Sequence, residues 1–352
     1  MTVKILAGIL LLFGLKWLYD YSFTRQEELP EKPIDQAWWD GLSDEWQNIL
    51  RINQYFHRHQ VDFYAVQQAY IQRLNEEDDS TTSVYNLPLR EWLEKQTYLL
   101  SYQDLYARVR KSHPDTDADS IDLNRLAQLD RIYMVSGPGD LSPLKKFPKL
   151  RILVINYCGI NHSLPIDEQV INLEPLRKLT QLEQLYCVSP ALKTLEPIKG
   201  LQKLTTLHCQ NSDVSTLEPV KNLTQLEHLA FGAKVKKAAV LGRFHNLKTL
   251  HISGCQEIPD LSGLKNLQQL SIVENELALV NSSFRIKSLD FLENLPALEV
   301  LDLELTSYRG SLDALKNHSQ LKAVTLPRVS SADMQAFKQA HPGCRIVNEY
   351  EW

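Results

Sequence analysis

The sequence predicts an α/β solenoid, a curved horseshoe in which a parallel β-sheet lines the concave face. Two observations predict it: a frame of leucines recurs nine times along the chain, and segments with helical periodicity flank the repeats. A coil of about 21 residues cannot bury its own apolar side chains, so neighbouring coils have to stack. We expect a helical cap at the N-terminal end and a helix–strand cap at the C-terminal end, because each open end would expose the core.

The repeat frame is a set of leucines at fixed spacing. The segment Leu204-Thr-Thr-Leu207-His-Cys209-Gln-Asn-Ser212-Asp-Val214 fits the template L-x-x-L-x-L-x-x-N-x-L, with cysteine allowed at the sixth place. The frames begin at Leu129, Leu150, Leu182, Leu204, Leu226, Leu247, Leu267, Leu298 and Leu321. A second motif, such as Leu195-Glu-Pro-Ile198, lies between several frames. Its proline suits the first turn of a short 3₁₀ or α segment on the convex side.

These motifs resemble those of the leucine-rich repeat family, in particular its short bacterial, internalin-like repeats of 21–22 residues. The resemblance covers about residues 120–352 and implies a non-enzymatic module that binds a partner protein through its concave face. The chain as a whole is predicted to have five parts, namely 1–21 (hydrophobic anchor or signal), 22–37 (linker), 38–120 (helical capping region), 121–330 (repeats) and 331–352 (C-terminal cap).

Four of the five cysteines fit structural places in the repeat, and the fifth, Cys344, falls in the C-terminal cap. Counting from the frame leucine, positions 1, 4 and 6 face inward and position 9 normally carries Asn or Cys. Cys158, Cys255 and Asn275 fall at position 9, with Ser212 and Thr306 as hydrogen-bonding substitutes. Cys187 and Cys209 fall at position 6 of adjacent coils, where we expect buried thiols. A Cys187–Cys209 disulfide is the alternative, because adjacent strands lie about 4.8 Å apart.

Helical periodicity marks both caps. Upstream of the repeats, one face of a helix is traced by Trp39, Leu42, Trp46, Ile49, Leu50 and Phe56. Downstream, Met334, Phe337 and Ala340 follow a serine N-cap at Ser331, and the residues after His341 are expected to form a last strand. Each segment is placed to cover one open end of the solenoid.

The N-terminus contains an apolar stretch of 11 residues, 5–15, followed by Lys16, Trp17 and Tyr19. We predict an uncleaved membrane anchor over residues 5–19, since no small-residue cleavage pattern follows and these flanking residues suit a membrane interface. A cleaved signal peptide and a buried or amphipathic helix are the alternatives. A cell-envelope location is therefore expected, and a cytoplasmic one stays open.

Charge and motifs argue against several other classes of function. The formal net charge is −5, and neither residues 1–125 (−7) nor residues 126–352 (+2) are basic enough to favour nucleic acid. The chain contains no G-x-x-x-x-G-K-[ST], H-E-x-x-H, G-x-S-x-G or C-x-x-C motif. No reaction and no cofactor are therefore predicted.

The candidate binding residues lie at positions 3, 5 and 7 of the frames, which point out of the concave face in this fold. They are Tyr133, Gln184, Tyr186, His208, Gln210, His228, His251, Asp302 and Glu304. Aromatic and polar side chains with little charge are typical of an interface centre. Two alternatives remain: a scaffold that acts by self-association, whose oligomeric state the sequence does not specify, and a metal or small-molecule site at His208, His228 and His251.

Two coils are about 10 residues longer than the others. Their extra residues fall near 161–170 and 278–287. Insertions in solenoids form loops on one face and often contribute to binding, but neutral variation in a tolerant loop explains them equally well.

Overall fold

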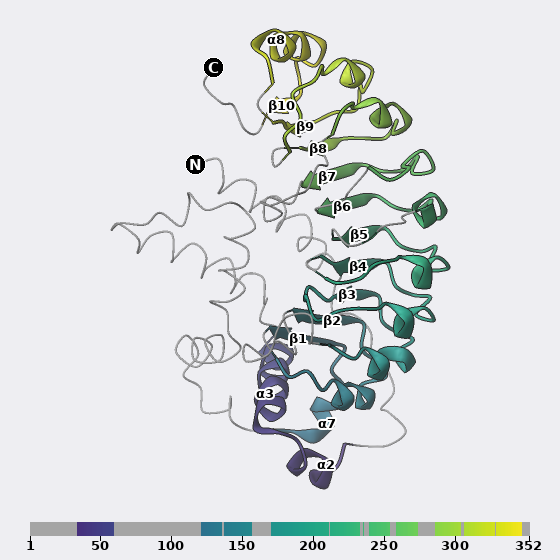
Figure 1. Cartoon of the computed structure of the whole chain (residues 1–352). Coiled ribbons are helices and arrows are strands. Elements are labelled where there is room, and N and C mark those ends of the chain that lie inside the picture. The colour runs from purple at the N-terminus through teal and green to yellow at the C-terminus, as the bar shows by residue number, and fades with distance from the viewer. Residues whose placement is uncertain are drawn as a thin grey trace.

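The computed structural model describes residues 34–59, 121–135, 137–156, 170–210, 212–232, 235, 239–253, 258–273, 286–303, 306–327 and 329–346. They form a stack of coils in which a single sheet of ten strands runs from β1 to β10 in chain order. Every neighbouring pair is parallel. Figure 1 shows the strands along the inner side of the stack and the short helical turns along the outer side. The predicted solenoid is confirmed.

The frames locate the strands. The strands are β1 (Arg131–Val135), β2 (Ile152–Asn156), β3 (Gln184–Tyr186), β4 (Thr206–Cys209), β5 (His228–Phe231), β6 (Thr249–Ser253), β7 (Gln269–Val273), β8 (Val300–Asp302), β9 (Ala323–Thr325) and β10 (Arg345–Ile346). Each of β1 to β9 begins two residues after a frame leucine, so all nine frames are confirmed.

The outer side consists of 3₁₀ turns. They are η3 (Ser142–Lys146), η5 (Glu174–Lys178), η6 (Glu196–Ile198), η7 (Glu218–Val220), η8 (Ala239–Arg243), η9 (Asp290–Asn294) and η10 (Asp313–Leu315). Proline occupies the first or second position of η3, η5, η6 and η7, as the second motif predicts.

A polar side chain before each of several turns fixes the local backbone. Its oxygen accepts a hydrogen bond of 2.9–3.1 Å from the amide two residues later. The acceptors are Asp140, Asn172, Thr194, Thr216, Asp260, Ser288 and Ser311. Asp, Asn, Ser and Thr favour such turns because their short side chains reach a nearby backbone amide.

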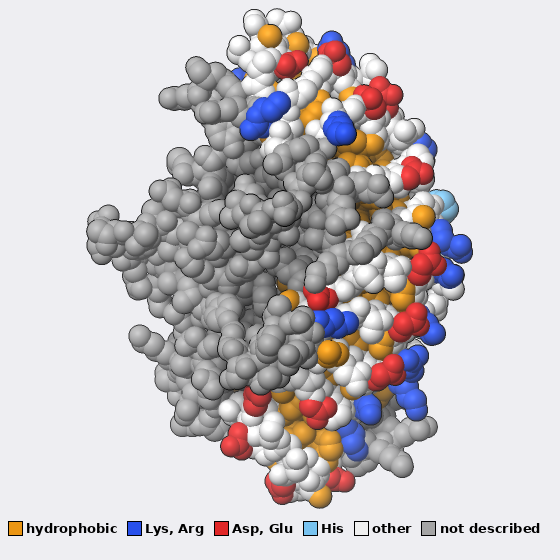
Figure 2. Space-filling view, in the orientation of Figure 1, with side chains coloured by type: hydrophobic (Ala, Val, Ile, Leu, Met, Phe, Trp, Pro, Cys, Tyr) orange, Lys and Arg blue, Asp and Glu red, His pale blue; other side chains and the backbone are white. Residues whose placement is uncertain are grey.

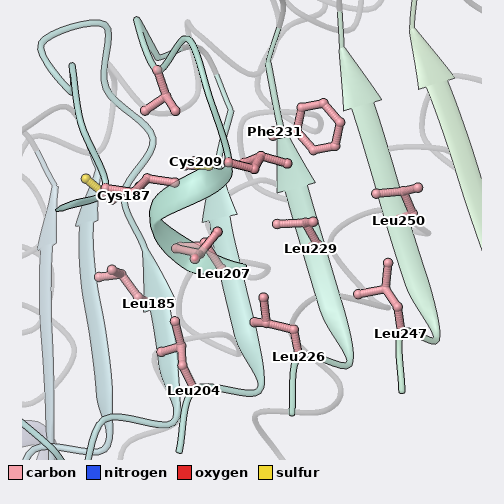
Figure 3. Close-up of a cluster of buried hydrophobic side chains, with 14 of the residues drawn as sticks. Leu185, Cys187, Leu204, Leu207, Cys209, Leu226, Leu229, Phe231, Leu247 and Leu250 are labelled. Carbon is pink, nitrogen blue, oxygen red and sulfur yellow. The ribbon is translucent and has the colours of Figure 1, made fainter. Parts of the chain in front are cut away.

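Inward-facing side chains build one continuous core between the two sides. Figure 3 shows the arrangement for the central coils, where Leu204, Leu207 and Cys209 stack on Leu226, Leu229 and Phe231, and these on Leu247 and Leu250. All eight are at most 1% exposed. Burial of a leucine side chain contributes about 1.5–3 kcal/mol, so the stacked frames hold the coils together.

The position-6 cysteines are thiols that take part in no disulfide. Cys187 and Cys209 are completely buried and form no disulfide, which excludes that alternative. The Cys209 sulfur lies 3.5 Å from the Ala230 carbonyl oxygen, and burial raises its pKa to about 12, so the thiol stays protonated. The expectation of structural, buried thiols is confirmed for both residues.

The position-9 substitutes bond inside their own turns as predicted. Ser212 Oγ donates to the Cys209 carbonyl at 2.6 Å, and Thr306 Oγ1 donates to the Leu303 carbonyl at 2.8 Å. The other position-9 residues, Cys158, Cys255 and Asn275, lie outside the described residues. So do most of the extra residues of the two long coils, near 161–170 and 278–287.

Helices precede the first coil. They are α2 (Gln36–Asp40), α3 (Asp44–His59) and α7 (Leu123–Leu126). Trp39, Trp46, Ile49 and Leu50 are at most 3% exposed, which confirms the predicted apolar face. Trp46 Nε1 also donates to the Asp140 carbonyl at 2.8 Å, linking α3 to the turn that follows β1. The remainder of the predicted helical region, residues 60–120, lies outside the described residues.

Two amides on α3 satisfy backbone groups of the first coil. Asn53 Nδ2 donates to the Tyr133 carbonyl at 3.1 Å, and the Tyr133 amide donates to Asn53 Oδ1 at 2.9 Å. Gln54 pairs in the same way with both backbone groups of Asp122, at 2.5 and 3.0 Å. The Asn53 amide thus takes the place that a further strand would occupy beside β1.

The C-terminal cap contains the predicted helix and strand. Helix α8 (Ser331–Ala340) buries Met334 and Phe337, whereas Ala340 is exposed. The N-cap is Ser330, one residue before the predicted Ser331, and its hydroxyl accepts from the Asp333 amide at 3.1 Å. β10 then pairs with β9 and extends the sheet.

None of the helices in the described ranges is long and apolar enough to cross a membrane. Residues 5–19, the predicted anchor, lie outside those ranges.

Candidate protein-binding face

Strand register brings the candidate side chains into two rows across the sheet. The position-5 row runs Tyr133, Val154, Tyr186, His208, Ala230, His251, Ser271, Asp302 and Thr325. The position-3 row runs Arg131, Ile152, Gln184, Thr206, His228, Thr249, Gln269, Val300 and Ala323. Residues two apart on a strand share a face, so both rows lie on the side of the sheet away from the leucine core.

Seven of the nine candidate residues belong to these rows. Gln210 directly follows β4, and Glu304 lies outside the described residues. Asp302, on β8, is thus the one of the two acidic candidates that the structure describes.

An apolar cluster occupies the N-terminal end of this face. Tyr133, Ile152, Val154 and Tyr186, from β1, β2 and β3, pack together and are 5–9% exposed. The cluster is separate from the leucine core, since it lies on the other side of the sheet. The Tyr186 ring continues it toward the next coil, where it meets the His208 ring edge-on, with centroids 4.7 Å apart and an interplanar angle of 67°.

The central histidines are neutral at physiological pH. Burial, with a smaller contribution from neighbouring histidines, lowers the pKa of His208 to about 3, and burial lowers that of His251 to about 4. Burial also lowers the pKa of His228, opposed in part by Glu227. The centre of the face therefore offers hydrogen-bonding rings that carry no charge.

The only described carboxylate in the position-5 row is held by a neighbour. Ser271 Oγ donates to Asp302 Oδ2 at 2.9 Å, from β7 to β8. Both residues stand at position 5 of consecutive frames, but the frames alone do not predict that their side chains bond.

The structure gives the metal alternative no support. Across the part of the chain that the structure describes, no three His, Cys, Asp or Glu side chains form a group suited to hold a metal ion. His208, His228 and His251 lie on three consecutive strands but do not converge in that way.

The outer side of the solenoid has a different character, because charged side chains there occur in pairs. Ion pairs within the turns join Glu174 to Arg177, Glu196 to Lys199, Glu218 to Lys221 and Asp313 to Lys316. Further pairs do not belong to the turns: residues directly before the strands of neighbouring coils pair as Arg151 with Glu183, Glu227 with Lys248 and Glu299 with Lys322. Figure 2 shows the resulting alternation of acidic and basic groups along the outer edge. Such exposed pairs stabilise little but keep this side well hydrated.

Stacked strand–turn coils with a continuous leucine core define a repeat solenoid, and comparisons with known proteins agree. The chain belongs to the leucine-rich repeat family, because the family model described as leucine-rich repeat region matches residues 131–340, more than half of the chain. No curated protein matches the sequence.

Several solved structures are similar in fold. They include an internalin, InlF, of Listeria monocytogenes (15% identity, 67% of this chain and 86% of that one covered, TM-score 0.33). Internalin C2 of the same organism is 18% identical; the match covers 59% of this chain and 75% of that one, with a TM-score of 0.36. A leucine-rich repeat protein of Leptospira interrogans is 18% identical; the match covers 63% of this chain and 67% of that one, with a TM-score of 0.38.

Proposed function

We propose that the chain is a non-enzymatic binding protein that holds a partner protein on the concave face of β1 to β8. Leucine-rich repeat domains are commonly protein-binding modules, and the family membership supports this class. The main support for the concave face is the difference in charge between the two sides of the solenoid. The position-3 and position-5 residues of β2 to β7 include no charged side chain, whereas the outer turns carry one ion pair after another.

Interface centres favour this composition. Charged residues are depleted there and aromatic residues enriched, because a buried charge needs a partner while a ring contributes a large area at a low entropic cost. At the N-terminal end of the face the rings come from Tyr133, Tyr186 and His208. The polar side chains on the following strands would orient a partner through hydrogen bonds. The eight strands β1 to β8, about 4.8 Å apart, give a face of roughly 34 Å, long enough for a protein interface.

Matched triple variants of the full chain test this proposal. We expect a partner retained by the parent to be lost by Tyr186→Ala/His208→Ala/His251→Ala and kept by Lys199→Ala/Lys221→Ala/Lys316→Ala, which alters only the outer turns. Affinity capture with quantitative mass spectrometry measures the retention, and circular dichroism checks that both variants fold.

Equal retention by both variants would contradict the concave assignment. Capture by neither the parent nor the outer-turn variant, together with concentration-dependent oligomers of the parent, would favour the self-association scaffold.

The proposed function includes a membrane tether formed by residues 5–19, with the following polar segment as its linker. The support is the apolar run of 5–15 with Lys16, Trp17 and Tyr19 at its end. We expect the full chain to float with liposomes of neutral phospholipid in a density gradient and to resist extraction at high salt. A Leu11→Asp/Leu12→Asp variant should remain at the bottom. Flotation of both proteins alike, or of neither, would refute the tether.

A further inference from the structure

The last coil differs from the others at one position of the leucine core. Three residues before the frame leucine, each of the eight earlier frames carries Leu or Phe. These residues are Leu126, Phe147, Leu179, Leu201, Leu223, Phe244, Leu264 and Leu295, all at most 1% exposed. The ninth frame carries His318 there, and this side chain is 6% exposed. An ionisable ring therefore occupies a core position at the C-terminal end of the solenoid.

The backbone at His318 is the same as in the earlier coils, so the difference lies in the side chain alone. Its amide donates to the Leu315 carbonyl at 3.0 Å, as the Leu295 amide does to the Leu292 carbonyl at 2.9 Å. The His318 ring forms a hydrogen bond to the backbone of Leu292 in the preceding coil. This ring can gain a charge that leucine cannot, and burial makes such a charge costly.

A second buried histidine reaches the last coil from the cap. His341 follows α8 as its C-cap residue and is 8% exposed. Its Nε2 donates to the Leu315 carbonyl at 2.8 Å, and its ring lies against that of Phe337, with centroids 4.8 Å apart. The Leu315 carbonyl thus accepts from both the His318 amide and the His341 ring. The two histidines lie at the joint between the last coil and the cap.

The charges that act on His318 come from both sides of this joint. Burial lowers the pKa of His318, and the positive charge of a protonated His341 lowers it further. The Leu292 backbone and the Glu293 carboxylate, from the preceding coil, oppose this shift in part. The other charged residues of the packed elements are Asp290 on η9, Asp313 and Lys316 at η10, Asp333 and Lys338 on α8 and Arg345 on β10, none of them buried. A protonated His318 is therefore disfavoured while the cap is closed.

The cap itself is a small terminal unit. Figure 1 shows α8 beyond the last strands, at the C-terminal end of the stack. β10 pairs with β9 only through Arg345 and Ile346, and α8 buries Met334 and Phe337. A terminal unit of a solenoid has a neighbour on one side alone, so it opens locally at a lower cost than the whole chain unfolds.

We propose that the C-terminal cap is an acid-sensitive closure of the solenoid, in which protonation of His318 releases α8 and β10 from the last coil. Above about pH 6.5 the ring is neutral in both the closed and the opened cap, and the closed form is stable. Below that value the opened cap binds the proton more readily than the closed one, so the equilibrium shifts toward opening. Opening exposes the apolar end of the leucine core. This inference is independent of the proposed function.

Hydrogen exchange of the full chain at pH 7.5 and pH 5, corrected for the intrinsic exchange rate at each pH, tests the proposal. The matched variant is His318→Leu, which restores the side chain of the earlier frames and leaves the Leu292 carbonyl its bond from the Leu295 amide. On acidification, we expect the α8 and β10 amides of the parent to lose at least about 3-fold more protection than those of His318→Leu. The limit is about 30-fold, set at pH 5 by an ordinary histidine pKa. The β4 amides should respond alike in both proteins.

Two further variants separate the joint from histidines in general. His341→Gln keeps a donor for the Leu315 carbonyl but removes the charge beside His318, so its cap should respond to acid less than that of the parent. His245→Gln replaces an exposed histidine and should respond like the parent.

Equal acid responses of the cap in the parent and in His318→Leu would overturn the inference. Cap protection that does not change between the two pH values would do the same. A loss of protection in the parent that is equal in α8 and β4 would also contradict it, because the cap would then open only together with the whole chain.

Discussion

Replacing Asn53 with alanine is expected to destabilise the N-terminal cap by about 2–5 kcal/mol, the largest effect of any single substitution considered. The Asn53 amide is the partner of both the Tyr133 amide and the Tyr133 carbonyl, at 2.9 and 3.1 Å. The side chain is 2% exposed, so water cannot replace it. Each backbone group left buried and unpaired costs about 1–3 kcal/mol.

The effect should be local at first, because each coil of a solenoid contacts only its neighbours. Hydrogen exchange should accelerate at the β1 amides, while β7 keeps its protection. Asn48→Ala is the matched control, since Asn48 lies on the same helix, is half-buried, and its oxygen accepts a 3.3 Å bond from Arg51 of that helix. It should change the free energy of unfolding by less than about 0.5 kcal/mol. Equal effects of the two variants would show that Asn53 does not support β1.

Acid is expected to weaken the fold by about 4 kcal/mol between pH 7.5 and pH 5 through His208 and His251. The folded-state pKa values are about 3 and about 4, below the unfolded value of about 6.5. The unfolded chain therefore binds more protons as the pH falls through 6.5, and stability falls with it. Each histidine contributes about 2 kcal/mol of that loss at pH 5.

Urea unfolding at the two pH values measures this loss. A His208→Gln/His251→Gln variant should lose much less stability on acidification than the parent, whereas His245→Gln, which replaces an exposed histidine, should behave like the parent. The carboxylates whose pKa values are lowered, such as Glu174 and Asp313, titrate below this window and do not obscure it. An unchanged pH dependence in the double variant would contradict the burial of these two rings.

The sequence predicted the strands well because the inward leucines alone determine them. Each strand starts two residues after a frame leucine, from Leu129 to Leu321, since burial of positions 1, 4 and 6 leaves one possible register. The same reasoning placed Cys187 and Cys209 in the core but left a disulfide open, because spacing cannot show whether two neighbouring sulfurs bond.

Polar contacts between distant residues were harder to predict. Asn53 lies three residues after Leu50 on the apolar face of its helix, and a polar residue at such a position indicates a buried hydrogen bond. Its partner Tyr133 is 80 residues away, so the sequence could not identify that contact. The Ser271–Asp302 bond joins two coils, one of them over-long, and required the register to be known.

The candidate face was predictable as a set of positions but not as a chemical environment. The frames place His208 and His251 in one row, and the structure adds that burial holds both rings neutral. Which polar atoms of the rows lack a hydrogen-bond partner depends on side-chain packing, so Gln184 Oε1 and Thr206 Oγ1 are identified as unpaired only in three dimensions.

The most direct test of the central claim is site-specific photo-crosslinking in the full chain. A photoreactive phenylalanine analogue replaces Gln210, beside the concave rows, in one protein and Lys221, directly after the outer turn η7, in another. The account predicts a covalent adduct with the partner from position 210 and none from position 221. Adducts from position 221 alone would place the partner on the outer side and contradict the account.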